Sequence, residues 1–377
     1  MSADLIVFGE DWGAHPSSTQ HLVRHMPGSR QVVWANSIGL RRPRLDAADL
    51  TRALRKLGRT FGPRHTDAAQ GTDAGAPTIV QPLVLPMAQG GLARALNRRL
   101  LAHRMRPAIR KARLHRPVLW ASLPSAVDAV GMLGEAAVVY YCGDDFGALA
   151  GVDHDRATAM EAELADRADL ILAASETLAR RFPAHKTRLL PHGVDHALFA
   201  TPAPRAADLP DDRPVAGYYG AIAPWLDQEA IAAAARALPD WIFVLVGPVL
   251  TDVRVLRAVP NIRLLGPRPH HALPGYAQHW TAGLVPFRDT AQIRASNPLK
   301  LREYLAAGRP VVATDFPALA PYRPHVTVVA PQDLADGLRR AQADAPDAVA
   351  LRQSLVAGES WHARAQEAAT LIDRLVA

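Results

Sequence analysis

Short apolar runs alternate along the chain with longer stretches rich in Ala, Leu and Arg. This alternation predicts parallel α/β layers, in which buried strands are joined by helices. The run Ile242–Val246 is apolar throughout, as expected for a strand that is covered on both faces. The predicted strands are Leu5–Phe8, Val32–Ala35, Thr78–Val80, Val118–Ala121, Ala137–Tyr141, Leu170–Ala173, Arg188–Leu190, Val215–Tyr219, Ile242–Val246, Ile262–Leu265, Gly283–Pro286, Pro310–Ala313 and Val326–Val329.

A proline-rich segment separates two such series of strands. Residues 199–214 hold four prolines among alanines and acids, a composition typical of a linker. We expect one Rossmann-like domain over residues 1–198, a second over residues 215–359, and a central cleft that both domains face. Residues 360–377 predict a helix, with Trp361, Ala365, Leu371 and Leu375 on its apolar side. Ligands of such sheets bind beyond the carboxyl ends of the strands.

The net positive charge of the chain comes from its first half. The chain has 43 Lys and Arg against 36 Asp and Glu, and residues 1–192 hold 25 and 18 of them, so the remainder is balanced at 18 and 18. The excess lies in Arg41–Arg64 and Leu92–Arg116. Leu92–Arg116 combines nine Lys and Arg with leucines at helical intervals, which favours a basic amphipathic helix on an anionic membrane surface. A simple solvated helix fits the same pattern.

Other features of the composition narrow the class of protein. The single cysteine, Cys142, excludes a disulfide framework and a cysteine metal cluster. No spacing of histidines and acids indicates a metal site. The chain runs from Met1 into Leu5–Phe8 without a basic leader, and no segment approaches the length of a membrane span. We therefore expect a cytoplasmic protein, with peripheral attachment to the inner face of the membrane as one possibility.

The strongest local motif runs from Ser296 to Val312. Asn297 can cap a helix that has Pro298 at its first position, and Gly308 can end that helix before a buried strand. A helix N-terminus attracts anions, and Lys300 adds a full positive charge there. Glu303 lies one turn further on, on the same face. The motif suits a nucleoside diphosphate, with phosphates on Lys300 and ribose hydroxyls on Glu303. An ordinary capped helix with a Lys–Glu pair is the alternative.

This motif resembles the donor-binding signature of GT-B glycosyltransferases of the family 4 (group 1) type. Three other segments resemble the same family in the expected order: Leu190–Asp195, where the family crosses between domains; Gly217–Ile222 with Asp227, at the opening of the donor domain; and Ser360–Trp361, at the helix that crosses back. The resemblance covers most of the chain. It implies the GT-B fold and a nucleotide-sugar donor, with no other cofactor and no metal.

The sequence departs from the family pattern at two places. The first of the family's paired glutamates falls on Ala295, and the loop Ala221–Trp225 lacks the family's Arg and Lys. Some phosphate contacts must then come from elsewhere, and Arg268 or Arg294 are candidates. With these departures, the sequence resembles a divergent branch of the family, the exopolysaccharide or teichuronic-acid transferases.

Candidate catalytic residues lie in the first half. Asp144 and Asp145 follow a predicted buried strand, and Asp144 matches the position of the family's sugar-contacting histidine. A carboxylate there could act as general base or stabilise positive charge on the donor sugar, or it could simply cap a helix. In the loop after the first strand, His15 is an alternative base, and Asp11 and Trp12 are candidate sugar contacts.

Two glycines and an apolar residue complete the candidate donor site. Gly220 and Gly247 end predicted strands, where backbone can approach a nucleotide, and Ile222 follows Gly220. Tight turns use glycine at the same positions.

The function expected from these features is transfer of a sugar from a nucleoside diphosphate to a hydroxyl acceptor, such as a lipid-linked or growing glycan. A nucleotide-sugar epimerase of the same fold is the alternative enzyme. A non-catalytic protein that binds membrane or nucleic acid is a third possibility, although nothing resembles a nucleic-acid-reading surface. The sequence leaves open the sugar, the base, the acceptor and the choice between retention and inversion.

Overall fold

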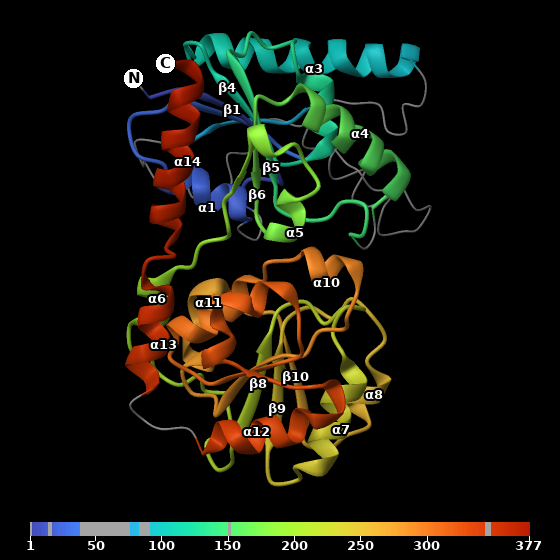
Figure 1. Ribbon diagram of the computed structural model, residues 1–377, viewed down its shortest axis with the longest axis vertical. Coiled ribbons are helices and arrows are strands. Elements are labelled where there is room, and N and C mark those ends of the chain that lie inside the picture. The colour runs from blue at the N-terminus through green and yellow to red at the C-terminus, as the bar shows by residue number, and fades with distance from the viewer. Residues whose placement is uncertain (1, 14–16, 38–75, 83–90, 150–151, 344–347) are drawn as a thin grey trace. The chain divides into compact units, whose positions relative to one another are not determined.

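The computed structural model describes the chain except for residues 1, 14–16, 38–75, 83–90, 150–151 and 344–347 (Figure 1). His15 and the basic segment Arg41–Arg64 therefore lie outside the described residues. The chain divides into two compact units. Unit 1 comprises Met1–Leu190 and Ala365–Ala377, and unit 2 comprises Pro191–Arg364.

Unit 1 is built on a seven-stranded parallel sheet with the strand order β3-β2-β1-β4-β5-β6-β7. Its strands are β1 (Leu5–Phe8), β2 (Val32–Ala35), β3 (Thr78–Val80), β4 (Val118–Ala121), β5 (Ala137–Cys142), β6 (Leu170–Ala173) and β7 (Thr187–Leu189). Its helices in the described ranges are α1 (Ser18–His25), α3 (Gly91–Lys111), α4 (His154–Arg167), α5 (Glu176–Ala179) and most of α14 (Trp361–Val376).

Unit 2 repeats this architecture with a six-stranded parallel sheet in the order β10-β9-β8-β11-β12-β13. Its strands are β8 (Val215–Tyr219), β9 (Ile242–Val246), β10 (Ile262–Gly266), β11 (Ala282–Val285), β12 (Val311–Ala313) and β13 (Thr327–Val328). Its described α-helices are α6 (His196–Ala200), α7 (Gln228–Ala237), α8 (Arg254–Arg257), α9 (Pro274–Ala277), α10 (Ala291–Ala295), α11 (Leu299–Ala306), α12 (Leu334–Gln342) and α13 (Ala348–Ala357).

All the predicted strands are present, and each end agrees to within one residue. The agreement follows from burial, because nearly every residue of β1, β4, β5, β8 and β9 is inaccessible to solvent. Strands covered on both faces are apolar at every position, and that signal is strong even in a single sequence. The predicted α/β class with two Rossmann-like sheets is therefore confirmed.

The segment expected to be the linker, residues 199–214, packs on unit 2 instead. The Ala206 amide donates to the Gly275 carbonyl at 3.0 Å, and Asp208 accepts from Arg268 at 2.7 Å. The boundary between the units falls earlier, between Leu190 and Pro191. Proline-rich composition thus marks an extended segment that is held by specific hydrogen bonds rather than a free tether.

Helix α14 begins in unit 2 and ends in unit 1. In unit 1 it is held by Asp373, which accepts from Arg30 at 2.7 Å and from the Ala3 amide at 2.9 Å. Its buried side chains are Trp361, Ala365, Ala368, Ala369 and Ile372. The predicted apolar side was therefore right at its first two positions, whereas Leu371 and Leu375 are only partly buried.

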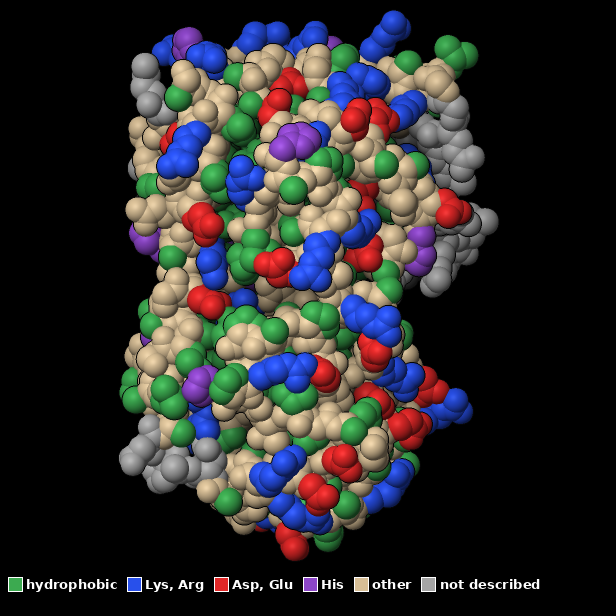
Figure 2. All heavy atoms as spheres, in the orientation of Figure 1, with side chains coloured by type: hydrophobic (Ala, Val, Ile, Leu, Met, Phe, Trp, Pro, Cys, Tyr) green, Lys and Arg blue, Asp and Glu red, His purple; other side chains and the backbone are tan. Residues whose placement is uncertain are grey.

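Helix α3 carries the predicted basic segment of unit 1. Asn97, Leu101, Ala102 and Met105 form its buried side. Leu92 and Leu96, two of the leucines noted at helical intervals, are 91% and 46% exposed. Figure 2 shows Lys and Arg side chains gathered along this helix at the top of the view. Within the described residues, no helix has the length and apolar character that spanning a bilayer requires.

Candidate functional site

Helix α11 carries the predicted donor motif and is fixed to the sheet of unit 2 through Tyr304. The ring of Tyr304 lies over Gly283 of β11, where a Cβ atom would come within 2.6 Å of it. The Tyr304 hydroxyl accepts a hydrogen bond from the Tyr219 amide of β8 at 3.0 Å. Gly308, with φ of +72°, ends the helix as predicted and leads into β12. The helix therefore starts at a set position beyond the carboxyl ends of β8 and β11.

The predicted cap of this helix is corrected by the structure. Leu299 is the first helical residue, and Pro298 occupies the cap position without a side-chain hydrogen bond. The Oδ1 atom of the Asn297 side chain accepts from the Arg302 guanidinium at 2.5 Å. Arg302 also donates to Glu359 at 2.5 Å. A charged donor is a stronger partner for the amide oxygen than a backbone N–H, so Asn297 helps to hold Arg302 in place.

Lys300 lies against the glycine turn that follows β8. A Cβ atom on Gly220, which has φ of +130°, would come within 3.1 Å of the Lys300 Cε atom. The ammonium nitrogen lies 5.4 Å from the Tyr218 ring centre and 5.1 Å from that of Phe287. Burial lowers the pKa of Lys300 to about 8, although the nearby Glu303 carboxylate acts in the opposite direction. A partly desolvated cation beside a glycine turn is well placed to bind an anion.

Gly247, which follows the neighbouring strand β9, allows the turn at Gly220 to form. It follows β9 with φ of +149°, and a Cβ atom there would lie 2.0 Å from the Gly220 carbonyl oxygen. Only glycine permits so close an approach of the two loops. Gly220, Gly247 and Lys300, which were predicted separately, are thus brought together at one edge of the sheet.

Glu303 is bound by two side chains that the sequence did not identify. Its Oε2 atom accepts from the Tyr219 hydroxyl at 2.6 Å, and its Oε1 atom lies 3.1 Å from the Nε2 atom of His270. The carboxylate raises the pKa of His270 by hydrogen bonding. The Glu303 side chain is 10% exposed. A carboxylate has four acceptor positions, so these two bonds orient it and leave capacity for ribose hydroxyls.

The remaining donor-site candidates are held by other groups. Ile222 is buried, and its amide donates to the Pro248 carbonyl at 2.9 Å. Arg268 pairs with Asp208 at 2.7 Å. Arg294 pairs with Asp289 at 2.6 Å. The charges of both arginines are thus balanced by neighbouring carboxylates, and no local sequence pattern indicates these pairs.

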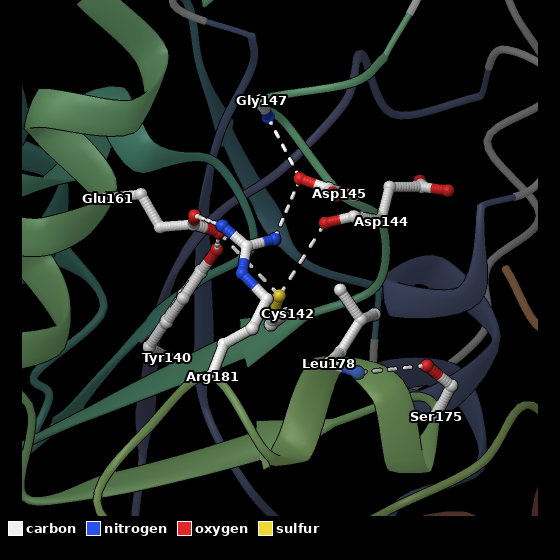
Figure 3. Close-up of polar contacts among 9 residues, drawn as sticks. All are labelled: Tyr140, Cys142, Asp144, Asp145, Gly147, Glu161, Ser175, Leu178 and Arg181. Atoms are coloured by element: carbon white, nitrogen blue, oxygen red, sulfur yellow. Dashed lines mark hydrogen bonds and ion pairs between the residues drawn. The ribbon is translucent and has the colours of Figure 1, made fainter. Parts of the chain in front are cut away.

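In unit 1, Asp145 belongs to an ion-pair network beneath the loop that follows β5 (Figure 3). Its carboxylate accepts from the Gly147 amide at 3.1 Å and from Arg181 at 2.7 Å. Arg181 also donates to Glu161 at 2.6 Å, and Glu161 accepts from the Tyr140 hydroxyl at 2.6 Å. Burial is the main cause that raises the pKa of Tyr140. Asp145 therefore fixes the loop.

Asp144 differs from its neighbour, and Figure 3 shows its side chain turned away from Arg181. Within the described part of the chain, its carboxylate has no hydrogen-bond or ion-pair partner. Desolvation by surrounding protein, and then the negative charges of Glu10 and Asp145, raise the pKa of Asp144 to about 6. The side chain is nevertheless exposed to solvent. An accessible carboxylate with a raised pKa is suited to accept a proton.

The loop after β1 is held by its own contacts. Asp11 accepts from the amide and the hydroxyl of Ser37, at 3.0 and 2.8 Å. The Trp12 ring packs edge-on against Trp34, with centroids 4.7 Å apart. Asp11 and Trp12 therefore both stabilise the conformation of this loop. In the ranges that the structure describes, no three His, Cys, Asp or Glu side chains cluster as metal ligands would.

Residues 213–344 match the family model described as glycosyl transferases group 1. TuaH of Bacillus subtilis (strain 168), a proposed teichuronic acid biosynthesis glycosyltransferase, is 34% identical over 171 residues. That alignment covers 42% of this chain and 43% of TuaH, so the chain matches less than half of the length of this relative.

Solved structures match over nearly the whole chain. HepE of Anabaena in complex with UDP and glucose has a TM-score of 0.68 at 13% identity, covering 98% of this chain and 99% of HepE. Sucrose-phosphate synthase of Thermosynechococcus elongatus has a TM-score of 0.71 at 17% identity, covering 99% of each chain. Together these matches confirm the expected GT-B fold, and residues 213–344 are similar to the group 1 glycosyl transferase family.

Proposed function

We propose that this protein transfers a sugar from a nucleoside diphosphate sugar to a hydroxyl acceptor. The observation that carries this proposal is the position of Lys300, whose partly desolvated ammonium group lies against the glycine turn after β8. Anions bind where backbone approaches closely and a cation is preorganised. The group 1 domain match and the nucleotide complexes of HepE, which hold UDP or UDP-glucose, support a nucleotide-sugar donor.

Lys300 would neutralise the diphosphate as it leaves, because negative charge develops on that group during transfer. Glu303, oriented by Tyr219 and His270, would accept hydrogen bonds from the ribose hydroxyls. Preorganised contacts of this kind add little reorganisation cost at the moment of reaction. Gly220 and Gly247 would let the phosphates approach the backbone.

Asp144 would serve the reacting centre. Its carboxylate has a raised pKa and no competing partner in the described residues, unlike Asp145. It could deprotonate the acceptor hydroxyl or stabilise the cationic sugar. Both roles require an accessible carboxylate, and the ion pair with Arg181 would weaken Asp145 in either of them.

The acceptor is a lipid-linked or growing glycan in this proposal, and helix α3 would hold unit 1 on the anionic inner face of the cytoplasmic membrane. Arg99, Arg104, Arg106, Arg110 and Lys111 are exposed on α3, and Leu92 and Leu96 are exposed near its start. Residues 91–116 contain no acid. Basic side chains attract anionic headgroups, and exposed leucines can enter the interface. The similarity of part of the chain to TuaH supports a polysaccharide product.

The alternatives from the sequence are less favoured. An epimerase would consume the donor without an acceptor, and the group 1 domain match points to transfer instead. A non-catalytic membrane- or nucleic-acid-binding protein would have no use for a partly desolvated cation and a buried carboxylate on one helix of unit 2.

The test is donor turnover by the full-length protein and by Lys300→Ala, with product analysis. We expect the wild type to release nucleoside diphosphate and to label a glycan acceptor, and Lys300→Ala to lose this activity. Full turnover by Lys300→Ala would refute the site assignment. Formation of an isomeric nucleotide sugar without acceptor would identify an epimerase.

A further inference from the structure

A nucleoside diphosphate carries more negative charge than Lys300 alone can neutralise. Sites for such groups usually combine several cations or backbone donors. The loop that follows β8, residues 220–227, contains neither Lys nor Arg. If the site contains a second cation, that cation comes from another element at the same edge of the sheet.

Most of the arginines that follow the carboxyl ends of the neighbouring strands are already neutralised. Each of four is paired with a carboxylate: Arg254 with Asp252 at 2.6 Å, Arg268 with Asp208 at 2.7 Å, Arg294 with Asp289 at 2.6 Å, and Arg323 with Asp315. Arg288, in the loop after β11, is different. Its side chain is exposed, and within the described ranges of unit 2 its guanidinium has no hydrogen-bond or ion-pair partner.

The position of Arg288 is fixed by its backbone. Its amide donates to the Trp225 carbonyl at 2.9 Å, which ties Arg288 to the loop that lacks basic residues. The preceding residue, Phe287, forms a β-bridge with Leu226 of the same loop. The Phe287 ring is also one of the two that face the Lys300 ammonium, at 5.1 Å. One short segment thus contacts both the loop after β8 and the Lys300 side chain.

Arg288 lines two hollows of unit 2. Arg288 lines a hollow of about 560 Å³ together with Gln228 and Thr251. It also lines a second hollow of about 980 Å³ together with Thr314 and Phe316. The Arg288 guanidinium therefore has room to turn toward a phosphate and offers it a planar fork of N–H donors.

We propose that Arg288 is the second cation of the diphosphate site and takes the role that the loop after β8 cannot fill. Its guanidinium would bind the phosphate nearer the sugar, while Lys300 would bind beside the glycine turn. This inference rests on the proposed donor function.

The test is calorimetric binding of the full-length protein to UDP, GDP and ADP, and to the corresponding monophosphates. The variants are Arg288→Gln, Arg288→Lys, and Arg254→Gln as the matched control, because Arg254 is another exposed arginine of the same hollow. Arg288→Gln should weaken the diphosphate about 10- to 100-fold, as loss of a charge-assisted hydrogen bond does. It should weaken the monophosphate much less, and Arg288→Lys should restore part of the affinity. Arg254→Gln should change either affinity less than about twofold.

Diphosphate binding by Arg288→Gln within about twofold of the wild type would overturn the assignment, and so would an equal loss for monophosphate and diphosphate. Absence of diphosphate binding by the wild type would instead refute the proposed donor function. Equal melting temperatures of Arg288→Gln and the wild type would show that the variant is folded, as expected for an exposed side chain.

Discussion

Replacing Lys300 by methionine should stabilise unit 2 and abolish nucleoside diphosphate binding at the same time. Methionine has a similar length and fills the same space beside Gly220, Tyr218 and Phe287, but it carries no charge to desolvate. Gain of stability with loss of function is expected where a functional group is held in an unfavourable environment.

The magnitude follows from the pKa of Lys300. Burial lowers this pKa from the ordinary value to about 8. A shift of that size corresponds to about 3 kcal/mol at most. Because the side chain is partly accessible, screening reduces the expected gain in the free energy of unfolding to about 1–2 kcal/mol. For a unit of this size, that gain raises the melting temperature by about 2–8 °C.

The gain should depend on pH with a definite sign. Below pH 8, Lys300 is protonated in the folded and the unfolded state, so the wild type bears the full cost of burying the charge. As the pH rises through about 8, the folded protein releases the proton while the unfolded chain retains it. The advantage of Lys300→Met should therefore shrink between pH 8 and pH 10.

The assay is thermal or urea unfolding of the wild type, Lys300→Met and Arg236→Met at several pH values. Arg236 is an exposed cation on α7 without a side-chain partner in the described part of unit 2, so its replacement should change stability by less than about 0.5 kcal/mol. If Lys300→Met unfolds more easily than the wild type at pH 7, the ammonium is not held in an unfavourable environment, and this account of the donor site is wrong.

Three further results are expected. The affinity for nucleoside diphosphate, measured by titration calorimetry, should fall up to about tenfold between pH 7 and pH 9. The reason is that Lys300 loses its charge with a pKa of about 8. An unchanged affinity over this range would contradict the prediction. Asp144→Asn should slow transfer about 10²- to 10⁴-fold without weakening nucleotide binding. The wild-type rate should also fall below about pH 6, where Asp144 becomes protonated. If Asp144→Asn retains full activity, Asp144 is not the base. Arg181→Met should destabilise unit 1 by about 3 kcal/mol in urea unfolding, because it leaves the buried Glu161 carboxylate without its cation; an unchanged midpoint would show that the network is not structural.

The strands and helix α11 could be predicted because their signals are local. Buried parallel strands are apolar at each position, and Gly308 ends a helix in a left-handed conformation that favours glycine. Lys300 and Gly220 could be chosen as candidates for the same reason, since each belongs to a short motif.

The partners of Glu303 could not be predicted, because no local pattern links them. Tyr219 precedes Glu303 by 84 residues and His270 precedes it by 33. Only the tertiary fold brings Tyr219, at the end of β8, and His270, after β10, to the Glu303 side chain. A single histidine such as His270, in a short segment after a strand, is by itself a weak indication of a functional site.

Competition between side chains explains the other differences. Asn297 has the residue type of a helix cap, yet Arg302 offers it a charged donor. Arg268 and Arg294 have the charge that a phosphate needs, yet Asp208 and Asp289 already neutralise it. Residue type predicts which interactions a side chain can make. Which partner it actually binds depends on the tertiary structure.

The central claim is that unit 2 binds a nucleoside diphosphate through Lys300. A thermal-shift screen of the wild type and Lys300→Met against UDP-, GDP- and ADP-sugars tests it most directly. We expect one base to raise the melting temperature of the wild type and to leave that of Lys300→Met unchanged. Failure of all of these nucleotides to stabilise the wild type, or equal stabilisation of both proteins, would contradict the claim.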